Sequence, residues 1–153
     1  MRQIKTARAA VRRLELMNTE LIAQTWQALD GRQVQFIEAF YQRFFERFPG
    51  YRRLFPRELR AAHFEKMVQT VALLANLADD RDDIAPHLRK LGSAHRPFDL
   101  APRDFGNFKA VFIEVLAPCA GSQWTKLAEQ AWSEAFDEVL IPLMREGVER
   151  QTA

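Results

Sequence analysis

The chain has 153 residues and a formal net charge of +2; 48% of its residues are hydrophobic and 27% are charged. This composition fits one folded domain and excludes a disordered chain, and the small net charge gives no case for a nucleic-acid-binding protein. The single cysteine, Cys119, excludes an internal disulfide and predicts a protein of the reducing cytoplasm. The longest strongly apolar run, residues 71–75, is too short to cross a bilayer, so no transmembrane segment is expected.

Residues 1–18 form a basic N-terminal extension with an apolar stripe. Arg2, Lys5, Arg8, Arg12 and Arg13 stand against one acid, Glu15. Such a segment can form a short amphipathic helix. In that case residues 1–17 would contact anionic lipid, a partner or another subunit. The alternatives are an extra helix packed on the domain, a frayed tail, or a targeting peptide.

The rest of the chain has strong helical periodicity. Apolar residues recur at spacings of three and four, whereas alternating β-branched stretches are missing. Proline and glycine mark the expected ends, and Pro102 suits the first turn of a helix. In chain order, the predicted helices cover residues 19–30, 33–47, 50–55, 58–78, 83–95, 101–117 and 123–149. The pattern therefore predicts an all-α domain at residues 19–150.

Three helix boundaries carry specific expectations. The acidic residues 79–83 are expected to cap the helix that ends near His95. Ser122 is a plausible N-cap for the last helix, and Pro142 lies inside that helix and should bend it or fray its end. These expectations depend only on local chemistry.

Two histidines stand out because of their surroundings. His95 lies near the end of one predicted helix, and His63 lies 32 positions earlier in another. The chain has 12 phenylalanines, whose apolar rings suit the lining of a dry pocket. Two histidines on opposing helices in an aromatic cavity can approach opposite faces of one planar iron cofactor, which makes haem the leading hypothesis. The alternatives are a helix-end histidine stabilised by the helix dipole, and a helical bundle without a cofactor.

The order of marker residues resembles that of a globin over about residues 19–149. The markers are Trp26, Phe45, Phe48-Pro49, Leu54-Phe55, Leu91-Gly92 with His95, and Ala131-Trp132. The chain is most similar in pattern to the single-domain bacterial globins, the haem domains of flavohaemoglobins, and the neuroglobin and cytoglobin branch. This resemblance implies a globin fold of six to seven helices, packed three over three around haem b.

The resemblance also implies roles for single residues. His95 matches the proximal iron ligand, with the carbonyl of Leu91 or the side chain of Ser93 as acceptor for its other ring nitrogen. Tyr41 matches the distal hydrogen-bond donor. His63 matches the distal residue, which either hydrogen-bonds a bound gas or binds the iron as a sixth ligand. The remaining residues that would contact the haem are Phe55, Lys66, Met67, Leu91, Arg96, Phe98, Leu100, Phe105, Phe108 and Phe136.

Within this set, Lys66 and Arg96 are expected to pair with the haem propionates, although each could equally be a solvated charge. Met67 would fill an apolar distal position, with plain packing as its alternative. His87, eight residues before His95, is expected on the surface.

The sequence also departs from its relatives. Only eight positions separate Phe55 from His63, so the loop between them is trimmed and the small fourth helix is expected to be absent. The tyrosine and glutamate that flavohaemoglobins pair with their proximal histidine fall here at Phe105 and near Gly147, which disfavours strong imidazolate character.

The implied function is reversible binding of O2, NO or CO at ferrous haem. The resemblance to bacterial globins adds an enzymatic use, the oxidation of NO with an external reductase, as in an NO dioxygenase. The alternative is a six-coordinate, bis-histidyl haem protein for electron transfer, or for gas or redox sensing.

Overall fold

The computed structural model describes residues 19–149, apart from the side chains of residues 77–83. Helical turns at residues 19–27 come first and end in a turn where Asp30 and Gly31 have positive φ. The elements that follow are α2 (Gln33–Arg47), η1 (Pro49–Leu54), α3 (Ala61–Ala75), α4 (Leu77–Ala94), η2 (Arg96–Phe98), α5 (Pro102–Ala120), η3 (Gly121–Gln123), α6 (Lys126–Ala135), η4 (Phe136–Leu140) and α7 (Ile141–Glu149). This part of the chain contains no strand, which confirms the all-α prediction. None of its helices is long and apolar enough to span a membrane.

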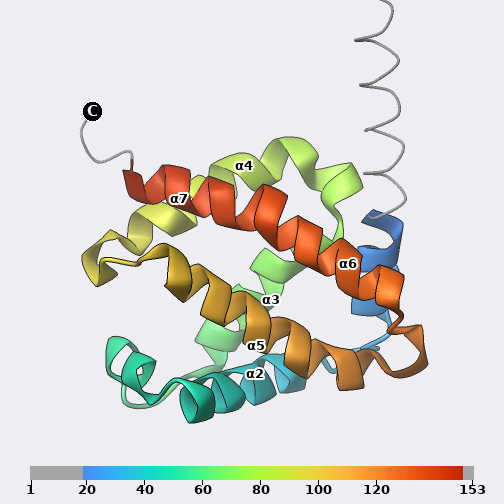
Figure 1. Ribbon diagram of the computed structural model, residues 1–153, viewed down its shortest axis with the longest axis horizontal. Coiled ribbons are helices and arrows are strands. Elements are labelled where there is room, and N and C mark those ends of the chain that lie inside the picture. Colours follow the sequence, from blue (N-terminus) through green and yellow to red (C-terminus); the bar gives the residue numbers. More distant parts are fainter. Residues whose placement is uncertain (1–18, 150–153) are drawn as a thin grey trace, which may run out of the picture.

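The helices form two crossing layers. α4 packs along α7, α2 packs on α5, and α3 contacts both α2 and α4 (Figure 1). The elements η1 and η2 lie on the left side of this view, whereas η3 lies on the right. Two loops distant in sequence therefore flank the same side of the molecule.

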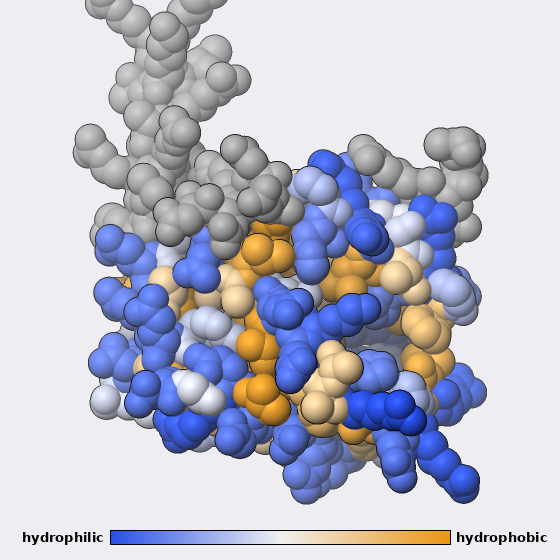
Figure 2. Space-filling model, turned by 180° about the vertical axis from the view of Figure 1, so that it is seen from behind, coloured by the Kyte–Doolittle hydropathy of each residue, from blue (hydrophilic) through white to orange (hydrophobic). Residues whose placement is uncertain are grey.

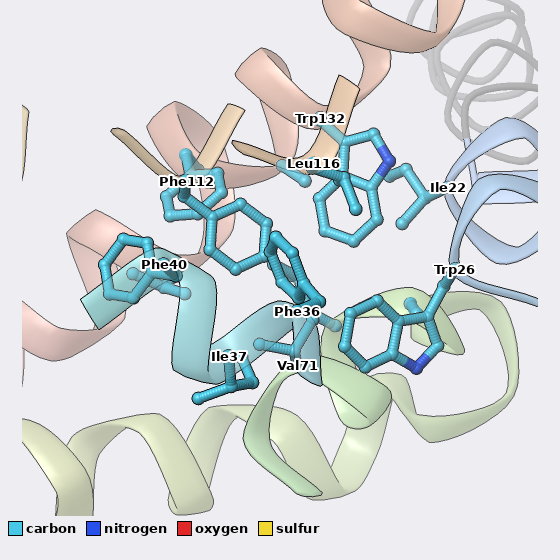
Figure 3. Close-up of a cluster of buried hydrophobic side chains, with 14 of the residues drawn as sticks. Ile22, Trp26, Phe36, Ile37, Phe40, Val71, Phe112, Leu116 and Trp132 are labelled. Carbon is cyan, nitrogen blue, oxygen red and sulfur yellow. The ribbon is translucent and has the colours of Figure 1, made fainter. Parts of the chain in front are cut away.

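Aromatic side chains fill the centre between the layers (Figure 3). Phe36 meets the ring of Phe112 edge-on at 5.1 Å, and Phe112 lies 5.5 Å from Trp132. The indole nitrogen of Trp132 donates to the hydroxyl of Thr25 at 2.6 Å, which satisfies a polar group inside the core. These contacts join residues 19–27, α2, α5 and α6 into one core.

Two glycines let α4 and α7 approach closely. A Cβ on Gly92 would lie 2.0 Å from the carbonyl oxygen of Met144, and one on Gly147 would lie 2.0 Å from that of Arg89. Real Cβ atoms do not come this close to a backbone atom, so each helix needs glycine where the other crosses it. The end of α4, which carries His95, is thus held directly against α7.

Two of the predicted boundaries are wrong. α3 ends at Ala75, and α4 begins at Leu77, so residues 79–83 lie inside α4 instead of forming a corner before it. The chain breaks at Asn76, whose side-chain amide donates to the carbonyl of Ala72 at 2.9 Å and closes the end of α3.

The N-cap of the following long helix is also different. Ser122 lies within η3, and Thr125 takes the capping role because it has the extended backbone an N-cap needs, with φ −122° and ψ 170°. Its hydroxyl accepts from the backbone nitrogen of Ala128 at 3.1 Å.

Pro142 distorts the last helix, as predicted, but it does so upstream of itself. Residues Phe136–Leu140 form a π-helical turn, in which the nitrogen of Ile141 donates to the carbonyl of Phe136. A proline clashes with the carbonyl four residues before it, and the wider turn accommodates that clash without ending the helix. The sequence predicts that the small helix found in classical globins between these positions is missing, and the described residues between Phe55 and α3 contain no helix. The predictions for residues 1–18 lie outside the described residues.

Candidate functional site

His95 caps the C-terminal end of α4. Its Nδ1 lies 2.7 Å from the carbonyl oxygen of Leu91, one turn earlier, which has no helical partner because the helix ends there. A carbonyl oxygen only accepts, so Nδ1 carries the proton of the neutral ring and Nε2 keeps its lone pair. The expected acceptor is confirmed as Leu91 instead of Ser93. The ring is thus oriented with a ligating nitrogen that no described residue occupies.

The loop after His95 is tied to α7. Arg96 donates from Nε to the carbonyl of Gly147 at 3.3 Å. The ring of Phe98 meets the ring of His95 edge-on at 5.8 Å, and 40% of Phe98 is exposed.

Tyr41 lies on α2 among aromatic rings. Phe55 packs edge-on against it at 5.5 Å, and Phe64 of α3 lies 6.0 Å away. Burial raises the pKa of Tyr41 to about 12, so its phenol stays protonated at neutral pH. Tyr41 is half-buried, and no described residue hydrogen-bonds to its hydroxyl.

The first two turns of α3 carry the other predicted distal residues. His63 and Lys66 are exposed and Met67 is half-buried against the core. Among the described residues, no hydrogen bond, ion pair or ring contact joins His63 to His95 or Tyr41. The structure therefore places Phe64 beside Tyr41 and Met67 against the hydrophobic core, and no described residue contacts the imidazole of His63 through a hydrogen bond, an ion pair or a ring contact.

The short loop before α3 is fixed by one arginine. Arg52 donates to the carbonyls of Pro56, at 2.8 Å, and Arg57, and its guanidinium lies over the ring of Phe45 at 5.2 Å. These contacts hold the loop folded against η1 and define where the helix that carries His63 begins.

The predicted walls on α5 and η4 form one aromatic group. Phe108 lies 4.7 Å from Phe40 and 6.2 Å from Phe136. Phe105 is buried, and Leu100 is half-buried against the core. Phe105, Phe108 and Phe136 thus belong to the same aromatic core as Phe40.

The sequence reasoning missed two polar contacts. His87 is half-buried, in contrast to its expected surface position, and its Nε2 lies 3.1 Å from the hydroxyl of Thr70, which donates to the carbonyl of Lys66 at 3.1 Å. This contact links α4 to α3. A threonine four residues after Lys66 on the inner face of a helix was the only local signal.

The second missed contact joins η1 to the start of α5. The hydroxyl of Tyr51 donates to Asp104 at 2.5 Å and accepts from Asn107 at 2.9 Å, while the other oxygen of Asp104 accepts from the nitrogen of Ala101 at 2.7 Å. Desolvation, reinforced by the bond to Asp104, raises the pKa of Tyr51.

The surface is hollowed on the side where η1 and η2 lie. Figure 2 shows this hollow at the right of the rear face, bordered by apolar residues above and strongly polar residues below. A second, open depression, lined by Gln24, Arg32, Cys119 and Gln123, lies between the first helical turns and η3 on the opposite side of the molecule. Each of four features is of a kind that a flat apolar cofactor carrying a metal would use: the hollow, the Nε2 of His95 and the hydroxyl of Tyr41, neither of which has a described partner, and the exposed ring of Phe98.

Comparison with known proteins supports this interpretation. A family model described as Globin matches residues 38–142, which is more than half of the chain. The chain belongs to the globin family. Globin CTT-E/E' of Chironomus thummi thummi is 33% identical over 67 residues. That alignment covers 44% of this chain and 43% of the relative, so the chain spans less than half of the curated globin it matches.

Membership in the globin family implies the general fold and cofactor of this chain. This globin is all-α, binds haem, and belongs to a family whose members bind diatomic gases. The matched residues include Tyr41, His63 and His95 together with most of the aromatic walls.

Proposed function

We propose that this globin binds O2, NO or CO reversibly, with His95 as the proximal ligand of haem b. The observation that carries the proposal is the bond from Nδ1 of His95 to the carbonyl of Leu91, which directs the Nε2 lone pair away from the helix end. When haem is bound, it supplies a ferrous iron that takes up small gases. His95 holds and orients that iron, and the ring of Phe98 limits how far the imidazole can rotate.

On the distal side, Tyr41 and His63 are the polar groups. The phenol of Tyr41 is neutral and has no described partner, so it can donate to the partly negative outer atom of a bound gas. One such bond would slow release of the gas by about tenfold, since a good hydrogen bond contributes roughly 1–2 kcal/mol.

The haem would be held mainly by apolar contact. The proposed contacts are Phe55, Met67, Leu91, Phe98, Leu100, Phe105, Phe108 and Phe136. The cations Lys66 and Arg96 would pair with the propionates at the edge of the hollow. Arg96 is positioned for this by its bond to the carbonyl of Gly147.

The visible spectrum of the dithionite-reduced protein, recorded before and after CO, tests the gas-binding function. We expect haem to be retained and CO to shift the spectrum. Purified protein that takes up no haem, or whose reduced spectrum does not respond to CO, would overturn the proposal.

Oxidation of NO to nitrate is the enzymatic use we propose, with an external reductase that returns the iron to the ferrous state. Its support is the Tyr41 hydroxyl, which would retain O2 until NO arrives. Rapid mixing of the oxygen-loaded protein with NO should give stoichiometric nitrate, and the absence of nitrate would refute this use.

A second candidate is a six-coordinate protein in which His63 binds the iron and gases must displace it. The observation that favours it is the short loop fixed by Arg52, which restricts how far the start of α3 can move away. In that case the reduced protein shows two sharp visible bands without gas, and His63→Leu converts them to one broad band. A six-coordinate spectrum that survives this substitution would exclude His63 as the ligand.

We further propose that residues 19–150 form the globin domain and that residues 1–18 act as a contact segment. Its support is the basic charge and apolar stripe of the sequence. Deletion of residues 1–17 should change the oligomeric state or the binding to anionic vesicles, and a truncated protein that matches the full chain in both would remove this role.

A further inference from the structure

Several cations on this globin are paired with acids. Arg43 and Arg47 contact Glu114 at 3.0 and 2.8 Å, Lys109 contacts Asp137 at 2.8 Å, and Arg145 of α7 contacts Glu149 at 3.8 Å. Five exposed cations and the half-buried Arg52 lie on or near η1, and no ion pair joins any of them to an acid among the described residues. We call this group the η1 rim: Arg52, Arg53, Arg57, Arg60, Lys66 and Arg103.

Hydrogen bonds bring together η1, the loop that follows it and the start of α5, which carry every rim residue except Lys66 of α3. The clamp of Arg52 on the carbonyls of Pro56 and Arg57 folds the loop back on η1. The bond from Tyr51 to Asp104 places the start of α5, and with it Arg103, beside η1. Although Asp104 is an acid in this region, both of its carboxylate oxygens are already occupied by Tyr51 and Ala101.

The hollow and η1 lie on the same side of the molecule. Figure 2 shows the most hydrophilic residues clustered directly below the hollow on the right side of the rear face, where η1 lies. The glutamates Glu58 and Glu65 only partly offset the six cations. A local excess of positive charge beside a low-dielectric cleft concentrates the electric field there and speeds the approach of negative partners.

We infer that the η1 rim docks an acidic electron-transfer protein against the edge of the haem site. This inference rests on the proposed function, because turnover in NO oxidation needs electrons from outside the globin. One electron would pass from the reduced flavin of the partner to ferric iron, which becomes ferrous. Electrostatic docking of this kind sets the rate of association more than the final affinity.

The described residues favour a protein over the other anionic surfaces. A lipid surface is ordinarily bound by cations interleaved with exposed apolar side chains, and the exposed large apolar residues, Phe98 and Leu127, lie outside the rim segments. Single-stranded nucleic acid is bound through exposed aromatic rings as well as cations, and the aromatics of η1 are packed against the core.

The test uses reduced flavodoxin, an acidic flavoprotein, as the probe. The full-length ferric globin is mixed with it under CO, and the second-order rate of formation of the ferrous CO spectrum is measured at low salt and at about 1 M salt. A rim variant, Arg53→Gln with Arg57→Gln and Arg60→Gln, is compared with wild type. We expect about a tenfold slower reaction at low salt, and a difference that vanishes at high salt.

A control variant of equal charge change separates docking from net charge. Arg32→Gln, Lys126→Gln and Arg145→Gln remove three exposed cations away from η1, and this variant should react as wild type does. Calorimetric titration with oxidised flavodoxin gives a second readout, in which only the rim variant loses affinity. Equal effects of the rim and control variants on rate and affinity would overturn the inference.

Two further outcomes keep this inference separate from the proposed function. Rim-dependent binding to phosphatidylserine vesicles, with no effect on flavodoxin, would overturn it in favour of a membrane surface. A globin that binds no haem or CO would refute the proposed function itself, whereas a haem-loaded, CO-binding protein indifferent to the rim refutes only the docking.

Discussion

Substitution of Gly92 by alanine should destabilise this globin, although alanine is the better helix former. The added Cβ would lie 2.0 Å from the carbonyl oxygen of Met144, which must retreat by about 1.4 Å to reach ordinary contact distance. Both atoms belong to helical backbone, so the clash is relieved only by moving α4 away from α7. Overpacking of this kind costs about 1–3 kcal/mol or more, against a gain of about 1 kcal/mol in helix propensity. We expect a net loss of about 2 kcal/mol.

Thermal and urea unfolding measure this loss, with Gly106→Ala as the matched control. Gly106 lies in α5, and a Cβ there meets nothing within 4 Å, so alanine should stabilise the protein by about 0.5–1 kcal/mol. Gly147→Ala should resemble Gly92→Ala because it meets the carbonyl of Arg89 in the same crossing. Moving α4 away from α7 once relieves both clashes. The loss of stability in the double variant, Gly92→Ala with Gly147→Ala, should therefore be smaller than the sum of the two single losses by at least about 0.5 kcal/mol, a typical coupling energy between residues in contact. A stability of Gly92→Ala equal to that of Gly106→Ala would refute the close crossing.

Tyr41 and Tyr51 should both titrate above the ordinary pKa of tyrosine, since burial raises both pKa values. In the Tyr51→Phe variant, absorbance at 295 nm should report Tyr41 alone, with a pKa of about 12, and a midpoint near 10 would contradict its burial. Because the unfolded chain loses this proton first, stability should fall as the pH rises from about 10 to about 12, by roughly 3 kcal/mol. The same Tyr51→Phe change should cost about 1–2 kcal/mol at pH 7, since it leaves Oδ1 of Asp104 without its donor while Oδ2 keeps the bond from Ala101; an unchanged urea midpoint would argue against the bond from Tyr51. Thr70→Val should lower the free energy of unfolding by about 1 kcal/mol, whereas Thr70→Ser should restore it, and an unchanged urea midpoint in Thr70→Val would contradict the α3–α4 link.

The sequence predicts the helices well because their apolar periodicity is long and regular. The boundaries at residues 79–83 and at Ser122 are wrong because capping strength alone does not decide where a helix starts. At Asn76 a side-chain amide closes α3 earlier, and after η3 the backbone is extended at Trp124 and at Thr125, whose hydroxyl then caps α6. Both depend on the path of the chain, which a local pattern does not contain.

Much of the candidate site is also accessible from the sequence. The bond from His95 to Leu91 could be expected because the two residues are one helical turn apart at a helix end. The contact between Thr70 and His87, and that between Tyr51 and Asp104, could not, since each joins segments whose distance is set by the tertiary fold. The need for glycine at position 92 could not be predicted either, because it arises from the carbonyl of Met144 on α7, which lies where a Cβ would be.

The measurement that most directly tests the central claim is haem binding by His95→Gly with and without added imidazole. If His95 ligates the iron through Nε2, the variant should lose haem or show an altered spectrum, and millimolar imidazole should restore the wild-type spectrum by filling the place of the missing side chain. A variant that retains haem with an unchanged spectrum and ignores imidazole would contradict the account.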